Sequence, residues 1–238
     1  QSLEGDYLAE MVALKQAGCV AFSQGDSVLP NAGVLKRVME YASTFDFSIW
    51  LRPQEEFLSH NGVIHEGEVA TRLGLSGIPT IAETMAVSII LMLAKETSAS
   101  IHLCRLSSLS AVELVRLAKH EGVKVTCDVA INNLHLSDID IGFFDTNYRL
   151  TPPLRSTRDR EGLRAGLVDN SVDLICSNHS PVKYDYKKLP LPDTKKTNTE
   201  KKPSSKLIKK VKDSKLVVKQ DVSSEENFEK SQKTESEA

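Results

Sequence analysis

Short apolar runs of strand length alternate with longer runs of helical periodicity along residues 1–182. The pattern predicts strands at 19–23, 47–51, 100–106, 123–129 and 172–178. It predicts helices at 35–44, 80–99, 110–122 and 158–170. Because strands that are separated by helical crossovers pair in parallel, the sequence indicates the α/β class. An open doubly wound sheet and part of a (β/α)8 barrel both fit this alternation.

Polar residues follow the predicted strands, and both architectures place functional residues at the carboxyl ends of strands. The segments that lie there are 23–26, 52–55, 105–108, 130–133 and 177–181. We therefore look for functional residues in these five segments first.

The composition changes near residue 182. Residues 1–182 carry 15 Lys and Arg against 22 Asp and Glu, a net charge of −7, whereas residues 183–238 carry 15 against 10, a net charge of +5. The second stretch is poor in large apolar residues, so burial cannot offset the entropy cost of ordering it. We predict one folded domain over 1–182 and a lysine-rich, disordered tail over 183–238, which either is simply solvated or contacts an acidic partner.

The overall charge of −2 gives no indication of nucleic-acid binding. No run of 18 apolar residues predicts a membrane span, and no leader-like segment follows Gln1, so we expect a cytoplasmic protein. Cys19, Cys104, Cys127 and Cys176 each lie in an apolar, strand-like run without zinc-motif spacing. We predict four reduced, buried thiols.

Five segments in order resemble the bacterial dihydroorotases of the amidohydrolase superfamily, over roughly residues 5–192. These are GEVATRLGLSGIPTIAE (67–83), IHLCRLSS (101–108), GVKVTCDVAINNLHLSDIDIG (122–142), PPLRSTRDREGLRAGL (152–167) and DLICSNHSPV (173–182). The resemblance implies a partial (β/α)8 barrel that lacks its first strands. In the active family, one or two zinc ions at the carboxyl end of the barrel activate a water that attacks the cyclic amide of dihydroorotate.

The resemblance also implies where the zinc ligands of an active enzyme would stand. An HxH pair would precede the chain, and the next ligand position falls on Gly25, or on Asp26 after a one-residue slip. Two histidine ligands are replaced by Arg52 and Arg105, and the aspartate that serves as ligand and proton carrier is replaced by Asn178.

Three further positions carry family roles by the same resemblance. Asn133 stands where the family has a histidine, Thr151 replaces a substrate-contacting asparagine, and His179 is the neighbour of the lost aspartate. We expect these residues to line a vestigial pocket together with the replaced ligand positions.

The chemistry of the replacements predicts that no metal binds there and that no catalytic residue remains. Arginine has no lone pair to donate and its positive charge repels Zn²⁺. Asparagine cannot carry a proton as aspartate does. Arg52 and Arg105 need compensation, and Glu55 and Asp128 are the candidate partners; the alternative is a retained site for a carboxylate or phosphate ligand.

The phrases CVAFSQ (19–24) and WLRP (50–53) resemble the non-catalytic, dihydroorotase-like branch of the family. That resemblance implies a structural subunit of a hetero-oligomer with the aspartate carbamoyltransferase catalytic chain, in pyrimidine biosynthesis. The alternative is an active zinc-dependent dihydroorotase with shifted ligands such as Asp26, Glu55 and His102. A small-ligand sensor and a decayed gene fragment also stay open.

Overall fold

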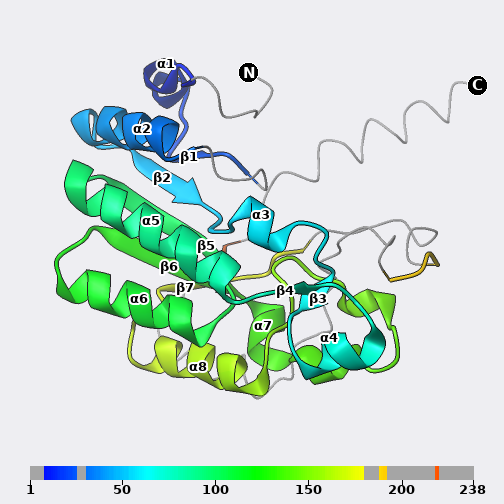
Figure 1. Cartoon of the computed structure of the whole chain (residues 1–238). Helices are drawn as coiled ribbons and strands as arrows, with labels where there is room; N and C mark the ends of the chain where they lie inside the picture. The colour runs from blue at the N-terminus through cyan, green and yellow to red at the C-terminus, as the bar shows by residue number, and fades with distance from the viewer. Residues whose placement is uncertain (1–7, 26–30, 180–187, 192–217, 220–238) are drawn as a thin grey trace, which may run out of the picture.

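The computed structural model describes residues 8–25, 31–179, 188–191 and 218–219 of the 238-residue chain (Figure 1). Six strands form a parallel sheet in the order β1-β2-β5-β6-β7-β8. Their bounds are β1 Phe22–Ser23, β2 Ser48–Leu51, β5 Ser100–Leu106, β6 Val125–Ala130, β7 Leu174–Cys176 and β8 Val218–Lys219.

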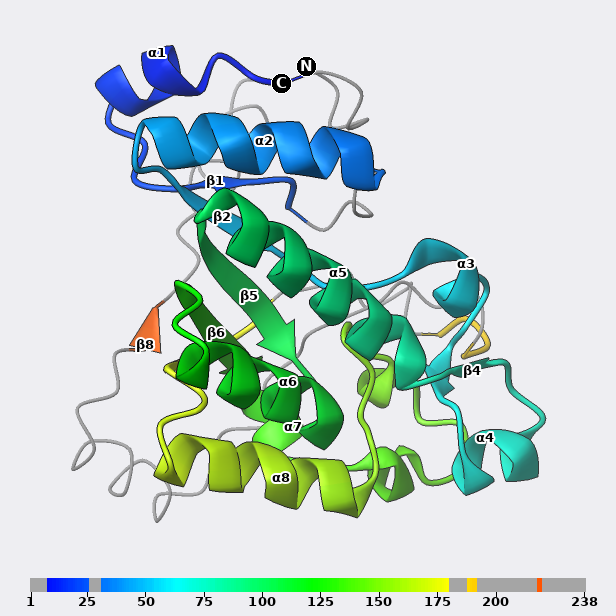
Figure 2. The ribbon, with the colours of Figure 1, turned by 60° about the vertical axis from the view of Figure 1, so that its left-hand side comes forward.

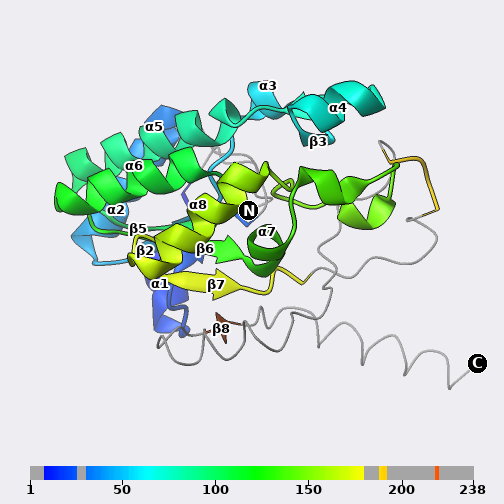
Figure 3. The same ribbon diagram turned by 90° about the horizontal axis from the view of Figure 1, so that it is seen from below.

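Helices α2, α5, α6 and α8 form one layer on one side of this sheet, as two perpendicular views show (Figures 2 and 3). They span α2 Ala32–Thr44, α5 Ile81–Thr97, α6 Leu109–His120 and α8 Thr157–Val168. Each contacts the next in that order, as consecutive crossovers of one hand do. A doubly wound sheet carries helices on both faces, so the single helical layer favours the barrel alternative.

Short elements lie at the carboxyl ends of the main strands (Figure 1). They include a second, two-stranded parallel sheet of β3 Ile64–His65 and β4 Gly77–Ile78. The others are α3 Glu56–Ser59, α4 Glu68–Leu73, α7 Ile131–His135 and the 3-10 turns η1 Asp138–Ile141 and η2 Thr146–Tyr148; α1 Met11–Gln16 lies at the amino end. A small apolar cluster that includes Ile64, Leu73 and Leu154 fills this region.

The two faces of the main sheet differ in chemistry because side chains alternate along each strand. Ile49, Ile101, Leu103 and Val125 are buried in the main core, together with Val87 and other residues of the helical layer. The alternate positions carry polar or aromatic residues: Trp50 pairs with His102, and His102 pairs with Thr126. A sheet that buries one face under helices and keeps polar groups on the other accounts for the alternation in the sequence.

Most predicted elements are confirmed. The strand at 100–106 is observed at those bounds, and helices α5, α6 and α8 begin and end within two residues of the predictions. Ser108 caps α6 by accepting from the backbone N–H of Ala111, and Ser156 caps α8 by accepting from that of Asp159. The sequence analysis did not predict α1, α3, α4, α7 or the β3–β4 pair.

The prediction of four buried cysteines needs a correction. Strand β1 begins at Phe22 rather than at residue 19, so Cys19 lies before it and is exposed. Cys127 is buried, and Cys104 and Cys176 are half-buried. None of the four forms a disulfide in the structure.

The predicted tail over 183–238 falls mostly outside the described residues. Two short stretches of it are described: Leu191 is buried in the small apolar cluster, and Val218–Lys219 pairs in parallel with β7. The predicted disorder of the tail stays a prediction. Among the described residues, no helix has the length and apolar character that crossing a membrane requires.

Candidate functional site

The structure brings three of the predicted site residues together at the carboxyl ends of the strands. Arg105 Nη1 donates to Asn178 Oδ1 at 3.0 Å, and Asn178 Nδ2 donates to the carbonyl oxygen of Thr151 at 2.9 Å. These two hydrogen bonds thus join the end of β5, the segment after β7 and the loop before the cis Thr151–Pro152 bond. The cationic Arg105 and the neutral Asn178 therefore bind each other at two positions to which the family resemblance assigns zinc ligands.

The backbone at these positions explains how the side chains meet. Arg105 and Asn178 have φ of 58° and 49°, in the left-handed region that residues other than glycine adopt uncommonly. Arg105 also lies in a register shift between Leu103 and Leu106, where β5 departs from its ladder with β6. Such a bulge changes the direction in which a side chain points, which is common at strand ends that carry functional residues.

The space around these residues is nearly filled. A cavity of about 10 Å³, room for about one water molecule, lies among Arg52, Arg105, Arg155 and the Pro152–Pro153 pair. Three guanidinium groups therefore line the predicted pocket. The predicted retained anion site would need more room than this, since a carboxylate or phosphate is several times larger than water.

The partners predicted for the arginines make other contacts. Glu55 accepts from the backbone N–H of Leu58 at 2.6 Å and caps α3, while Arg52 Nη1 donates to Gln54. Asp128 accepts from the backbone N–H of Arg105 at 2.7 Å. The side chains of Arg52 and Arg105 thus donate to amide oxygens, of Gln54 and Asn178, and the carboxylate of Asp128 binds the main chain of Arg105.

The remaining predicted residues do not converge as closely. Asn133 is buried and its Nδ2 donates to the carbonyl oxygen of Pro153 at 2.9 Å, so it holds the loop that lines the cavity. Gly25 follows β1 with φ of 65° and has no side chain that could bind a metal. Its backbone N–H donates to Ser23 Oγ. His179 is exposed, and Asp26 lies outside the described residues.

A buried charged pair that the sequence analysis did not single out lies beside the pocket. Glu83, in the first turn of α5, accepts from the backbone N–H of Ser107 at 2.7 Å and from the hydroxyls of Ser107 and Ser108. Burial raises the pKa of Glu83, and the nearby charge of Arg155 and these donors oppose the shift. The one sequence signal was an acidic residue inside an otherwise apolar helical run.

Arg155 fixes the β3–β4 region to the main sheet. Its Nη1 donates to the carbonyl oxygen of Ile78 at 2.6 Å and lies 3.1 Å from His65 Nδ1, and its Nε donates to Ser107 Oγ at 3.1 Å. Arg155 is 4% exposed. The arginine of the PPLR segment therefore has a positioning role.

Zinc does not fit the positions that the family resemblance assigns to it. Gly25 has no donor atom, Arg52 and Arg105 carry positive charge, and Asn178 is already bound on both ends of its amide. Zinc takes thiolate, imidazole or carboxylate ligands, of which these four positions supply none. No hydrolytic step can be derived through a metal at this place.

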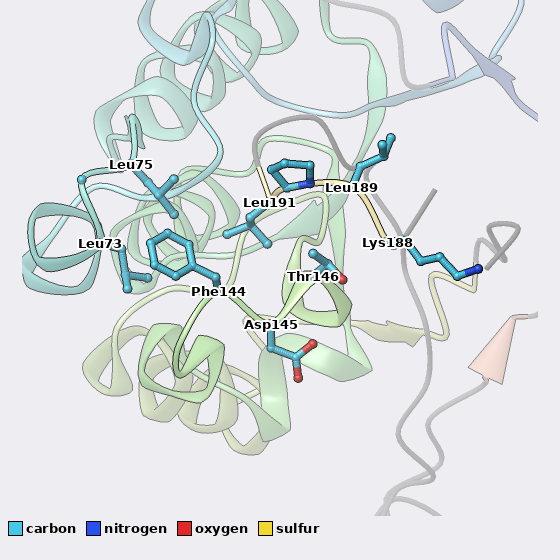
Figure 4. Close-up of a pocket in the computed structure, with 10 residues that line it drawn as sticks. Leu73, Leu75, Phe144, Asp145, Thr146, Lys188, Leu189 and Leu191 are labelled. Carbon is cyan, nitrogen blue, oxygen red and sulfur yellow. The ribbon is translucent and has the colours of Figure 1, made fainter. Parts of the chain in front are cut away.

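A second hollow, of about 770 Å³, lies between α4, the η1–η2 region and residues 188–191 (Figure 4). Leu73, Leu75, Phe144 and Leu191 face one another across it, while Asp145 and Lys188 point away. Its described lining is mainly apolar and brings no acid, base or nucleophile together, so it carries no candidate chemistry.

His65 should make the stability of the folded chain depend on pH. Burial and the charge of Arg155 lower the pKa of His65 below its ordinary value of 6.5. The unfolded chain then takes up a proton before the folded chain as pH falls below 6.5, so the free energy of unfolding should decrease there. We expect His65→Gln to make this decrease smaller in urea titrations across that range.

The decrease should not vanish in His65→Gln, because burial and the charges of Arg164 and Arg160 lower the pKa of His135 in the same direction. His120→Gln, at an exposed position, is the matched control. A profile in His65→Gln that is as steep as that of the wild type would contradict the assignment.

Comparison with solved structures defines the class. D-hydantoinase (dihydropyrimidinase) from Thermus sp. matches with a TM-score of 0.65 and 16% identity, over 79% of this chain and 44% of that structure. L-hydantoinase (dihydropyrimidinase) from Arthrobacter aurescens matches with a TM-score of 0.66 and 21% identity, over 79% and 43%. At these identities the likeness shows the fold alone. This chain has the fold of part of an amidohydrolase-type (β/α)8 barrel.

Sequence relatives narrow this class. A family model described as dihydro-orotase-like matches residues 2–111. Dihydroorotase-like proteins from Pseudomonas putida and Pseudomonas aeruginosa are each 40% identical over 190 residues, which is 80% of this chain and 45% of theirs. A dihydroorotase from Caldanaerobacter subterraneus subsp. tengcongensis is 39% identical over 190 residues, 80% of this chain and 44% of its own length. The matched part of the chain is similar to dihydroorotases and to dihydroorotase-like proteins, which confirms the resemblance found in the sequence.

Two facts limit what these relatives say about activity. The chain spans less than half the length of each. Proteins named dihydroorotase-like and proteins named dihydroorotase match almost equally well, at 40% and 39% identity. Overall similarity does not separate the two kinds, so the residues of the pocket have to.

Proposed function

We propose that this chain belongs to a catalytically inactive, dihydroorotase-like protein that serves as a structural subunit of an aspartate carbamoyltransferase assembly in the cytoplasm. The observation that carries the proposal is the hydrogen bond of 3.0 Å between Arg105 and Asn178. It joins two positions at which the family resemblance places zinc ligands, and the cavity beside it holds about one water molecule. Among the described residues, an arginine and an asparagine that bind each other replace two zinc ligands of the family pattern, which supports a role in assembly.

The alternative is an active zinc-dependent dihydroorotase with ligands shifted to Asp26, Glu55 and His102. Glu55 already has another role, because it caps α3 by accepting from the backbone N–H of Leu58. Glu55 follows β2, while His102 lies within β5 on the polar face. This distribution favours the inactive alternative.

The first test is hydrolysis itself. We expect the zinc-supplemented protein to hydrolyse dihydroorotate at the rate of buffer alone, because no oriented, metal-bound water is available. The Arg105→His variant should be equally inactive, since Gly25, Arg52 and Asn178 still supply no ligands. An intact dihydroorotase in the same buffer is the positive control. A zinc-dependent rate above the blank in the wild type would favour the active alternative.

The second test addresses the partner. We expect the protein, co-expressed with the aspartate carbamoyltransferase catalytic chain of its own organism, to give one large complex of fixed stoichiometry by light scattering. The catalytic chain expressed alone gives the reference mass. Two separate peaks would remove the structural role even if hydrolysis is absent, so the two tests fail independently.

A further inference from the structure

Three side chains that could bind a metal ion, His102, Cys104 and Asp128, lie close together on the polar face of the sheet. His102 and Cys104 are alternate residues of β5, and Asp128 lies on the neighbouring strand β6. Their ligand atoms, a ring nitrogen, a sulfur and a carboxylate oxygen, all lie within 4.8 Å of one another. His102 and Asp128 are buried, at 3% and 8% exposure, and Cys104 is half-buried.

This grouping arises from strand register. Side chains two residues apart on a strand share a face, and the parallel ladder sets His102 opposite Thr126, two residues before Asp128. The cysteine spacing of the sequence gave no sign of it. The three residues lie below the strand ends, whereas Arg52 and Asn178 follow their strands, so this place differs from the positions that the family resemblance assigns to zinc.

Hydrogen bonds already orient the side chains of Asp128 and His102. Asp128 Oδ1 accepts from the backbone N–H of Arg105 at 2.7 Å, and Oδ2 lies 2.9 Å from His102 Nε2. His102 Nδ1 lies 2.8 Å from Thr126 Oγ1. Without a cation, Nε2–H donates to the carboxylate and Nδ1 accepts from the Thr126 hydroxyl. When a cation binds Nε2, the ring proton moves to Nδ1, which then donates to Thr126 Oγ1. A hydrogen bond to the second ring nitrogen is the usual support of a histidine ligand.

Cys176, on the neighbouring strand β7, is not one of the residues whose ligand atoms lie within 4.8 Å of one another. Burial and the charge of Asp128 raise the pKa of its thiol, so it stays protonated. One thiolate from Cys104 and one carboxylate from Asp128 balance the charge of a dication without it.

We propose that His102, Cys104 and Asp128 form a binding site for a zinc-like divalent cation. Nitrogen, sulfur and oxygen donors together are the ligand set of Zn²⁺, whereas Mg²⁺ and Ca²⁺ take oxygen ligands. Zinc distances of about 2.0–2.3 Å to these donors require the three side chains to close around the ion. Because His102 and Asp128 are buried within the sheet, the site is structural and links β5 to β6. It does not rest on the proposed function.

The chain contains a built-in reporter for this site. Trp50 is its one tryptophan, and the ring lies 4.7 Å from that of His102. Co²⁺, which takes the place of zinc in such sites, quenches a nearby indole and gives a thiolate charge-transfer band. We expect titration of the full chain with Co²⁺ to quench Trp50 emission and to produce that band together, saturating at one equivalent, with added Zn²⁺ reversing both.

Variants separate this site from adventitious binding. Cys104→Ser should lose the band and most of the quenching, while Cys19→Ser, at the exposed cysteine, should keep both. Thr126→Val, which removes the hydrogen bond to His102, should weaken Co²⁺ affinity about 10–100-fold. Asp128→Asn keeps an acceptor for the backbone N–H of Arg105 and serves if Cys104→Ser does not fold.

The proposal fails on any of three results. The first is the absence of a thiolate band in the wild type. The second is quenching or a band that persists in both Cys104→Ser and Asp128→Asn. The third is loss of either signal in Cys19→Ser, which would place the cation at another cysteine.

Discussion

Replacing Glu83 by alanine should reduce the free energy of unfolding by about 3–5 kcal/mol, the usual cost of leaving a buried charge without its partner. Glu83 is 4% exposed, and so is Arg155, whose charge acts on it. The substitution also leaves the backbone N–H and hydroxyl of Ser107 and the hydroxyl of Ser108 without the acceptor that they now use. Domains of this size are stable by about 5–15 kcal/mol, so the loss is a large fraction of the total.

The effect is measured by urea or guanidinium unfolding. Glu83→Gln should lose less than Glu83→Ala, because the amide oxygen still accepts from Ser107. Glu113→Ala, at an exposed position of α6, is the matched control and should change stability by less than about 0.5 kcal/mol. The double variant Glu83→Ala with Arg155→Met should lose less than the sum of the single losses, because the residues are coupled. A loss below about 1 kcal/mol for Glu83→Ala would contradict the described network.

Leu103→Ala should reduce the free energy of unfolding by about 2–5 kcal/mol, through lost apolar contact and the cavity that remains. Leu103 is fully buried in the middle of β5, between Leu51 and Cys127 of the neighbouring strands, and it belongs to the main core. Leu117→Ala on the outer side of α6 removes the same atoms from a side chain that is 58% exposed. Thermal unfolding of the two variants should therefore differ clearly, and similar losses would show that β5 does not lie at the centre of the core.

The elements that the sequence predicted well are those whose pattern repeats. Strand β5 has seven residues and α5 has seventeen, so alternation and helical periodicity are both visible within them. Strands β3 and β4 have two residues each, which is too short for the alternation of a strand to be visible. Their position depends on long-range contacts such as the bond from Arg155 to the carbonyl oxygen of Ile78.

The candidate site was predictable in the same uneven way. The meeting of Arg105 and Asn178 follows from the rule that parallel strands end at one edge, together with the family resemblance. Glu83 was not predicted because nothing local reveals that a helix buries this acidic residue against a neighbouring loop, while Glu96 of the same helix is exposed. The cluster of His102, Cys104 and Asp128 was not predicted because it requires the register between β5 and β6, which the sequence does not contain.

The two unlike faces of the sheet have a consequence for how such a protein changes over generations. Substitutions at the helix-covered positions, such as Leu103 and Val125, are constrained by packing whether or not any reaction takes place. Substitutions at the strand ends are constrained by local hydrogen bonding and charge rather than by packing. Selection for a stable shape therefore preserves the ancestral likeness in one set of positions while the other set drifts. The residues that maintain the fold and those that would determine activity therefore lie at different positions of the same strands. Activity can be lost at such positions while the similarity to relatives remains.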